Sequence, residues 1–349
     1  GSHCEEIKPA RRRVEATFAM NGVSGTVTLS QEYATGPTTV TLALDGLDSA
    51  AGGYHVHDLP VPLATPGEEG LCTLTGGHFN PFSKPVCAAG MTADECEVGD
   101  LSGRHGTLSG LSSVSKTYVD WNLPLFGPNS VVGRSIVIHA SDGSRLACAS
   151  IGYPGAVKTV VATFSGSVVG SVTLRQLEGA PESETSMLVD LSYSDGSAAS
   201  TTGHKWHVHV DPVDPSSDCT STGGHYNPYG VCLTSECGYG SRCGGYGQQV
   251  QCEVGDASGK HGALSLSAGG GRTFYTDLQL PLSGFASVDG RSITLHAADG
   301  GAPRLACATL SAVPSREVEA VFSMNGVSGT VTLSQEYATG PTTVTLALD

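Results

Sequence analysis

Residues 12–45 read RRVEATFAMNGVSGTVTLSQEYATGPTTVTLALD. Apolar residues alternate with polar neighbours along this stretch, at Val14, Ala16, Phe18 and Met20 and again at Val40, Leu42 and Leu44. A period of two predicts strands that bury one face, and turn residues that recur roughly every eight to twelve positions are typical of an antiparallel sandwich or barrel. No convincing helix longer than a turn or two is visible. We therefore expect an all-β protein.

The same stretch returns at residues 316–349, where three of the 34 positions differ. A weaker repeat lies inside this period, because GGHFNP (76–81) returns as GGHYNP (223–228) and CEVGDLSGRHG (96–106) returns as CEVGDASGKHG (252–262). A period of this kind indicates tandem domains. We interpret the chain as repeat 1 (12–153), repeat 2 (157–312) and a partial third repeat (316–349) that holds only the N-terminal strands.

Length and composition agree with this organisation and exclude some classes of function. The 349 residues suggest two domains at roughly 150 residues each. A net charge of −15 argues against binding nucleic acid through the overall field, and no apolar run reaches the ~20 residues of a membrane helix. Eleven cysteines are typical of a secreted, disulfide-stapled protein. Gly1-Ser2-His3 looks like a cloning scar, so secretion is inferred from cysteine usage alone.

Histidines occur where a metal ion would need them. His55 and His57 form a His-Val-His motif, and residues i and i+2 of a strand face the same way, so both rings can reach one metal. His78 in GGHFNP and His139 at the end of an apolar strand are further candidates. Repeat 2 carries the same set at His207, His209, His225 and His296. Four imidazoles suit copper, and tetragonal nitrogen sites favour Cu(II).

The motifs HVH, GGHFNP, VGDL, GRSxxxHA and SRLAC, in this order and again in repeat 2, resemble the copper/zinc superoxide dismutase family. The resemblance implies an eight-stranded Greek-key barrel and the conversion of superoxide to oxygen and hydrogen peroxide. It implies that the eight histidines named above bind copper, and that His78 and His225 leave reduced copper and accept a proton. It places the active-site arginine at Arg145 and Arg304, and the intrasubunit disulfides at Cys72–Cys148 and Cys219–Cys307.

Two departures from the family pattern predict copper without zinc. The loop after HFNP has no histidine in either repeat, and Asp100 and Asp256 alone remain of the zinc ligands, too few for a tetrahedral site. The arginine follows the last histidine by only six residues in repeat 1 and eight in repeat 2, which leaves no room for the long electrostatic loop. Both losses resemble the copper-only branch, and the tandem array resembles the animal copper-only dismutase repeat proteins.

Glu97 and Glu253 stand where a zinc ligand would be. We expect them to orient His78 and His225, because a metal-bound histidine usually has its other nitrogen held by a carboxylate or carbonyl. The alternative is that they are solvated loop residues. His105 and His261 are interpreted as hydrogen-bonded turn residues, and His204 as a loop residue.

The remaining cysteines are expected to staple the remodelled loop. The predicted pairs are Cys87–Cys96 in repeat 1 and Cys232–Cys252 in repeat 2, with Cys237 and Cys243 as a local pair inside an insertion. Cys4 is left without a partner. A zinc site made of these cysteines is a poor alternative, because no CxxC pair exists.

Three functions are compatible with these residues: a secreted copper enzyme that acts on superoxide, an extracellular copper carrier or buffer, and an array of spacers. Retention of both arginines favours the enzyme, because a carrier needs no guide for anions. The partial third repeat would expose unpaired strand edges. We expect it either to replace residues 12–45 of a neighbouring molecule by strand exchange or to be a non-native remnant. Neighbouring repeats of the array are the other expected partners.

Overall fold

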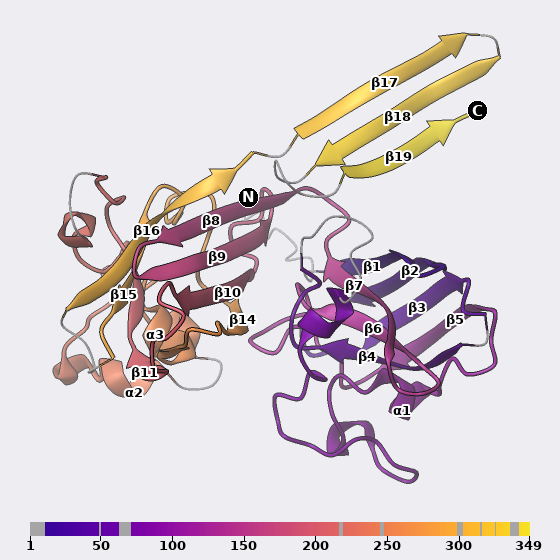
Figure 1. Cartoon of the computed structure of the whole chain (residues 1–349), viewed down its shortest axis with the longest axis horizontal. Helices are drawn as coiled ribbons and strands as arrows, with labels where there is room; N and C mark the ends of the chain where they lie inside the picture. The colour runs from indigo at the N-terminus through magenta and orange to yellow at the C-terminus, as the bar shows by residue number, and fades with distance from the viewer. Residues whose placement is uncertain are drawn as a thin grey trace, which may run out of the picture. The chain divides into compact units, whose positions relative to one another are not determined.

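A computed structural model describes residues 11–48, 50–62, 71–215, 219–244, 248–298, 303–314, 316–324, 326–335 and 342–349. These residues form antiparallel sheets with a few short helical turns, which confirms the all-β fold class (Figure 1). The chain divides into two compact units, one ending at Pro154 and the other beginning at Gly155. Each unit has its own hydrophobic core. Within the described residues, no helix is both long and apolar enough to cross a bilayer.

Repeat 1 is one curled seven-stranded sheet in the order β4-β6-β7-β1-β2-β3-β5. Strands β3 and β4 follow each other in the chain but lie at different ends of this order, so the connection between them crosses over, as a Greek key requires. The strands are β1 (Arg12–Met20), β2 (Val23–Gln31), β3 (Thr38–Asp45), β4 (Ala51–His57), β5 (Ser113–Asp120), β6 (Ser135–Ala140) and β7 (Arg145–Gly152). The short helices are η1 (Leu71–Thr75), η2 (Ala93–Glu95) and α1 (Leu101–His105).

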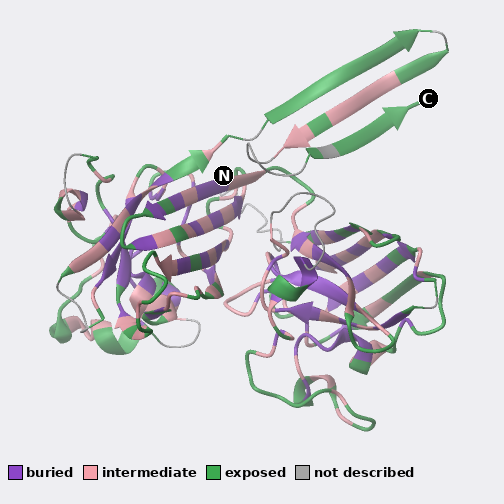
Figure 2. Cartoon of the chain, viewed as in Figure 1, coloured by how far each residue is buried: buried purple, intermediate pink, exposed green. Residues whose placement is uncertain are grey.

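The first hairpin shows how the sequence sets the register. Asn21 and Gly22 both have positive φ, at 52° and 82°, so the two-residue turn is of the type whose twist matches antiparallel strands. The turn pairs Met20 with Val23 and, further along, Phe18 with Gly25. A Cβ on Gly25 would lie 2.1 Å from the carbonyl oxygen of Ala43, so only glycine fits there. The alternating apolar residues consequently point into the core, and Figure 2 shows buried and exposed residues alternating along these strands.

Repeat 2 has the same sheet order, β12-β15-β16-β8-β9-β10-β14, and a separate pair β11-β13. Its strands are β8 (Val157–Ser165), β9 (Val168–Leu177), β10 (Thr185–Tyr193), β11 (Thr201–His204), β12 (Trp206–His209), β13 (Leu264–Leu266), β14 (Arg272–Asp277), β15 (Ser292–His296) and β16 (Arg304–Val313). Its short helices are η3 (Cys219–Thr222), η4 (Ser235–Cys237), α2 (Tyr239–Arg242), η5 (Gln249–Gln251) and α3 (Ala257–His261).

The described part of repeat 1 has seven strands where the resemblance implied eight. The sheet ends at β4 and β5, and α1 begins after β4 where a closing strand would be needed. The helix forms because the side chain of Asp100 accepts a hydrogen bond from the Gly103 N–H at 2.8 Å, which caps its first turn. One bond, from Leu108 N–H to the Gly52 carbonyl oxygen at 2.8 Å, still joins the following segment to the β4 edge. In repeat 2 the three-residue strand β13 takes this place.

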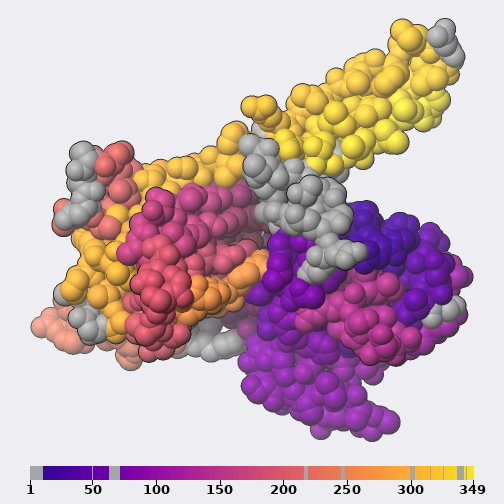
Figure 3. Space-filling view, viewed as in Figure 1, coloured from indigo at the N-terminus to yellow at the C-terminus, as the bar shows by residue number. Residues whose placement is uncertain are grey.

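The partial third repeat is a sheet of three strands, β17 (Arg316–Met324), β18 (Val327–Gln335) and β19 (Thr342–Leu348). Its pairing repeats that of β1–β3, since Phe322 faces Gly329 as Phe18 faces Gly25. Its burial differs: Leu346 is 67% exposed, whereas the equivalent Leu42 is 1% exposed. Strands β17–β19 are the yellow, C-terminal part of the space-filling view (Figure 3). The sheet therefore forms with the predicted register, but among the described residues it lacks a second layer to cover its apolar side chains.

Candidate metal centre

Four histidine rings converge in repeat 1. His55 and His57 lie on β4, and His78 follows in a loop that forms an isolated bridge with His57. His139 is the penultimate residue of β6, which pairs with β4. One nitrogen from each of the four rings lies within 4.8 Å of the others. The fold thus brings together residues that the sequence separates by up to 84 positions.

In each ring, the nitrogen that forms a hydrogen bond outside the centre determines which nitrogen faces the other rings. The Nδ1 of His57 lies 3.0 Å from the Gly76 carbonyl oxygen, and the Nδ1 of His139 lies 3.0 Å from that of Gly143. Each Nδ1–H therefore donates outward, and the two Nε2 atoms face each other at 3.3 Å. His55 is turned the other way: its Nε2 lies 3.0 Å from the Ser102 hydroxyl, and its Nδ1 is buried without a hydrogen-bond partner.

Burial keeps the rings of His57 and His139 neutral. It lowers the pKa of His57 to about 3, although the bond to Gly76 opposes the shift, and it lowers the pKa of His139 as well. A neutral imidazole offers a lone pair, which a metal ion needs and a protonated ring lacks. Converging lone pairs in a buried place are costly unless a cation or a proton joins them. The arrangement therefore fits a metal ion held by four nitrogens.

Repeat 2 builds the same centre from His207, His209, His225 and His296. The Nδ1 of His209 lies 2.9 Å from the Gly223 carbonyl oxygen, so its Nε2 faces inward. The Nδ1 of His207 and the Nε2 of His209 are buried without hydrogen-bond partners. Burial lowers the pKa of His207 to about 2 and that of His209 to about 4. His207 and His209 thus present the same ring nitrogens as His55 and His57 in repeat 1.

Glu97 and Glu253 each contact the histidine for which they were proposed. The Nδ1 of His78 lies 2.9 Å from the Glu97 carboxylate, and that of His225 lies 3.1 Å from the Glu253 carboxylate. The side chain of Glu253 is only 4% exposed, so the solvated-loop alternative does not describe it. These contacts leave the Nε2 of both rings for the centre.

Asp100 and Asp256 lie behind the first histidine of each centre. The distance from His55 Nε2 to Asp100 is 3.4 Å, and that from His207 Nε2 to Asp256 is 3.6 Å. Asp100 also accepts bonds from the backbone N–H groups of Cys87 and Gly103, which together with His55 hold the pKa of its carboxyl well below the usual range despite its burial. A carboxylate held in this way fixes the orientation of the ring.

Arg145 is tied down at the edge of the centre by neutral acceptors. Its guanidinium donates to the carbonyl oxygens of Cys72 and Gly76 and to the Thr75 hydroxyl, with 2.6 Å to Gly76. Gly76 accepts from His57 too, so the arginine and a histidine of the centre share one anchor. Arg304 repeats the pattern with Cys219, Thr222 and Gly223. The positive charge is thereby fixed in position without being cancelled by a carboxylate among these contacts.

His105 and His261 are hydrogen-bonded, as expected, but the residues that surround them were not identified from the sequence. Arg104 donates to the Glu97 carbonyl oxygen at 2.6 Å and to the buried Asp120 at 2.8 Å, and the Nε2 of His105 lies 2.8 Å from the same carboxylate. In repeat 2, Lys260, His261 and Asp277 form the equivalent cluster. The sequence feature that could have identified these clusters is a basic residue directly before each turn histidine, in SGRHG and SGKHG, together with an aspartate at the end of a predicted strand.

His204 was misplaced by the sequence analysis. It lies on β11 rather than in a loop, is 1% exposed, and its Nδ1 is 2.8 Å from the backbone carbonyl oxygen of His296. Its strand is only four residues long, and a bulge interrupts its pairing with β13, so alternation could not reveal it.

The disulfides agree with three of the expected pairs and correct the others. Cys72–Cys148, Cys87–Cys96 and Cys219–Cys307 are bonded. Cys232–Cys252 and Cys237–Cys243 were wrong, because the bonds join Cys232 to Cys237 and Cys243 to Cys252. The separation of nine residues in Cys243–Cys252 equals that in Cys87–Cys96, so the insertion lies before the loop disulfide rather than within it. Cys4 lies outside the described residues.

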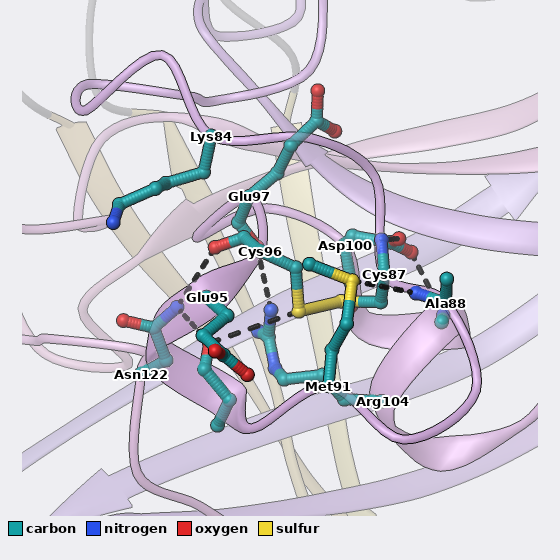
Figure 4. Close-up of a disulfide and its surroundings, with 12 residues drawn as sticks. Lys84, Cys87, Ala88, Met91, Glu95, Cys96, Glu97, Asp100, Arg104 and Asn122 are labelled. Atoms are coloured by element: carbon teal, nitrogen blue, oxygen red, sulfur yellow. Dashed lines mark hydrogen bonds between the residues drawn. A yellow bond between two sulfur atoms is a disulfide. The ribbon is translucent and has the colours of Figure 1, made fainter.

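Figure 4 shows the loop disulfide of repeat 1 beside the glutamate that contacts the centre. Cys96 directly precedes Glu97, and the Cys87 N–H donates to Asp100 at 2.9 Å. Arg104 reaches the same loop from α1. The disulfide therefore joins the segment that carries both carboxylates, Glu97 and Asp100, to the segment at Cys87, whose N–H holds Asp100.

Comparison with known proteins places this geometry in a family. A sequence model described as "Copper/zinc superoxide dismutase (SODC)" matches residues 23–151 and 168–309, which is more than half of the chain. The chain belongs to the copper/zinc superoxide dismutase family. Each of the two matched ranges contains its own complete four-histidine centre.

Curated relatives include two proteins of Candida albicans. The chain is 42% identical over 120 residues to "Cell surface Cu-only superoxide dismutase 5", which covers 33% of this chain and 49% of that protein. It is 41% identical over 120 residues to "Cell surface superoxide dismutase [Cu-Zn] 4", covering 33% and 48%. The chain thus spans about half the length of the curated relatives it matches.

Among solved structures, Candida albicans superoxide dismutase 5 with Cu(II) matches at a TM-score of 0.35 and 34% identity, covering 42% of this chain and 93% of that one. A variant of the same protein, in which one glutamate is replaced by alanine, matches at a TM-score of 0.36 and 33% identity, covering 43% and 92%.

The donor set in each centre fits copper. Every candidate ligand is an imidazole, the type of ligand that Cu(II) accepts in nitrogen-rich sites, and two buried ring nitrogens of repeat 2 lack any other partner. Each outer nitrogen described above contacts an oxygen atom, as metal-bound histidines in proteins normally do. The absence of zinc stays a prediction.

Proposed function

We propose that the protein is an extracellular copper-only superoxide dismutase with one copper site in each complete repeat and no zinc. The observation that carries the proposal is the pairing, in both repeats, of a buried four-imidazole centre with an arginine anchored at its edge. Relatives named as cell-surface dismutases and the five disulfides support an extracellular location. Repeats 12–153 and 157–312 are proposed as the functional units.

In this proposal copper would be held by His55, His57, His78 and His139, and by the four equivalent histidines of repeat 2. Bound copper would supply the one-electron chemistry that converts two superoxide ions and two protons to oxygen and hydrogen peroxide. The protein's own part is to bury the rings and to orient them, the latter through Gly76, Gly143 and Asp100 in repeat 1.

His78 and His225 are proposed to carry a proton during the reaction. Their side chains are 28% and 38% exposed, against 15% for His55 and 8% for His207, so they offer a route between solvent and the centre. Glu97 and Glu253 hold their Nδ1 atoms, which leaves Nε2 as the atom that can take up and release a proton.

Replacing Arg145 and Arg304 together with alanine is expected to lower the rate of superoxide decay per bound copper by roughly ten- to a hundredfold, because locally focused charge raises the encounter rate of an anion by about that range. The net charge of −15 repels superoxide at long range, so attraction must be local. The measurement is superoxide decay by pulse radiolysis at constant copper content. The control is Arg11→Ala with Lys158→Ala, which also removes two positive charges, from residues that pair with Glu32 and Asp289. An unchanged rate per copper would refute the role of the arginines.

The test of the function is superoxide decay by the copper-loaded chain, with bound copper and zinc counted on the same sample. Two copper ions, no zinc and catalytic decay are the expected result. Two copper ions without decay above that of the metal-free chain would instead identify a copper carrier. One copper ion, or zinc in stoichiometric amount, would contradict the assignment of sites.

The partial third repeat is proposed to exchange strands with a second molecule. Its three strands repeat the pairing of β1–β3, while its apolar residues lack, within the described chain, the layer that covers Val14, Phe18 and Leu42 in repeat 1. Replacing residues 12–45 of a neighbour would bury them. We expect dimers whose fraction rises with concentration, measured by light scattering after chromatography, and their loss in a chain that ends at residue 313. A full chain that stays monomeric at high concentration would contradict exchange.

A further inference from the structure

The two repeats hold their supporting carboxylates in different ways, and this difference carries an inference that rests on the proposed copper sites. In repeat 1 two separate backbone contacts are used. The Cys87 N–H donates to Asp100 Oδ2 at 2.9 Å, and the Glu97 N–H donates to the Pro85 carbonyl oxygen at 2.9 Å. Asp100 and Glu97 in turn contact His55 and His78.

The insertion in repeat 2 removes the first of these contacts. Cys243 is the equivalent of Cys87, because each lies nine residues before its disulfide partner. The Cys243 N–H donates to the Tyr239 carbonyl oxygen at 2.8 Å, the bond that closes helix α2. This N–H is therefore turned to the helix, and Asp256 needs another donor for its second carboxylate oxygen.

The side chain of Tyr239 supplies that donor. Its hydroxyl donates to Asp256 Oδ2 at 2.6 Å and accepts the Glu253 N–H at 3.2 Å. One atom thus replaces both backbone contacts of repeat 1. Burial, and after it the hydrogen bond to Asp256, raises the pKa of Tyr239, so the phenol stays protonated and remains a donor at neutral pH.

Asp256 and Glu253, the two residues that Tyr239 contacts, each contact a histidine of the repeat 2 centre. Asp256 Oδ1 lies 3.6 Å from His207 Nε2, and Glu253 Oε2 lies 3.1 Å from His225 Nδ1. The rings of His207 and His225 stack at 3.8 Å between centroids, so a shift of either carboxylate changes the relative placement of two copper ligands. We propose that Tyr239 is a positioning residue of the repeat 2 copper site, one that joins the two carboxylates behind His207 and His225 and has no counterpart in the described part of repeat 1.

The experiment uses the full chain with His57→Ala and His139→Ala, so that copper binding at neutral pH reports repeat 2. Tyr239→Phe removes the hydroxyl and keeps the ring. The matched control is Tyr229→Phe, which makes the same change on a tyrosine that is 56% exposed in the loop before the insertion. Direct partners of metal ligands change metal affinity by ~10–100-fold, and Tyr239 acts one bond further out, so we expect Tyr239→Phe to speed copper transfer to EDTA roughly three- to tenfold. The Cu(II) EPR hyperfine splitting should change with it, while Tyr229→Phe leaves both as in the parent.

A background variant separates positioning from general loosening of the loop. In a chain with Glu253→Ala, Tyr239 can act on the ligands only through Asp256, so the effect of Tyr239→Phe on copper transfer should be clearly smaller. The same fold-change in both backgrounds would mean that Glu253 carries none of the effect, and would overturn the inference that Tyr239 acts by joining the two carboxylates. Hydrogen exchange of the metal-free chain gives a second readout: the Glu253 amide should exchange faster in Tyr239→Phe only.

The outcomes also separate this inference from the proposed function. If the parent binds no copper in repeat 2, the proposed site fails and the inference fails with it. If the parent binds copper, and Tyr239→Phe matches Tyr229→Phe in copper transfer and EPR spectrum, the site stands and the role of Tyr239 is wrong.

Discussion

Replacing His57 with alanine should remove the copper of repeat 1 and about half of the superoxide decay of the chain, because independent sites contribute additively. His57 is 1% exposed, and its Nε2 lies 3.3 Å from that of His139, so no other side chain can take its place without rebuilding the centre. Copper should be counted per chain after dialysis against a weak chelator, with the rate of decay measured on the same sample.

The matched variant is His209→Ala, which removes the equivalent ring of repeat 2. Each substitution should remove one copper and leave the other site with its original spectrum, and the two together should abolish both copper binding and catalysis. Loss of both copper ions from either single variant would mean that the chain holds its metal in some other arrangement than two self-contained centres.

Removing the Cys72–Cys148 disulfide should destabilise repeat 1 by about 4.5 kcal/mol, the chain entropy released when a loop of this length is no longer closed. The bond closes 76 residues of sequence, and the Cys72 carbonyl oxygen also accepts a hydrogen bond from Arg145. Cys72→Ala with Cys148→Ala should therefore lower both stability and the rate per copper. Urea unfolding followed by circular dichroism gives the first quantity, and superoxide decay on the folded fraction gives the second.

The loop disulfide of the same repeat provides the comparison. Cys87–Cys96 closes only nine residues, so its removal is expected to cost about 2.6 kcal/mol on the same entropic scale. Its loss should make Glu97 and Asp100 more mobile while leaving Arg145 in place. It should therefore lower the affinity for copper more than it lowers the rate of reaction with superoxide per bound copper. A larger loss of stability from this pair than from Cys72–Cys148 would contradict the entropic argument.

Much of the fold and the centre could be predicted because their signals are local or repeated. Alternation from Val14 to Met20 identifies a strand with one buried face, and the Asn21-Gly22 dipeptide that follows makes the hairpin turn. His55 and His57 are two residues apart on that kind of strand, so their common direction follows from the period alone. His78 and His139 required the family motifs, because the sequence does not show that β6 pairs with β4.

The features that could not be predicted depend on which of several nearby groups forms a given disulfide or hydrogen bond. Cys232, Cys237, Cys243 and Cys252 allow three pairings, and proximity within the folded insertion selects among them. After Asp100 the chain forms the capped helix α1 instead of an eighth strand. The alternation of apolar and polar residues does not show which of these two structures is more stable. Tyr239 reaches Asp256 only because α2 withdraws the Cys243 N–H, a consequence of backbone geometry that no sequence pattern records.

The first and last strands of a repeat lie side by side, β1 against β7 and β8 against β16. The chain consequently enters and leaves each repeat at neighbouring points. A domain whose termini are adjacent can be inserted or deleted as a whole, because joining it to another domain requires only a short linker and no change in its core. Duplication can therefore lengthen such a chain while every added unit arrives with its metal site already complete.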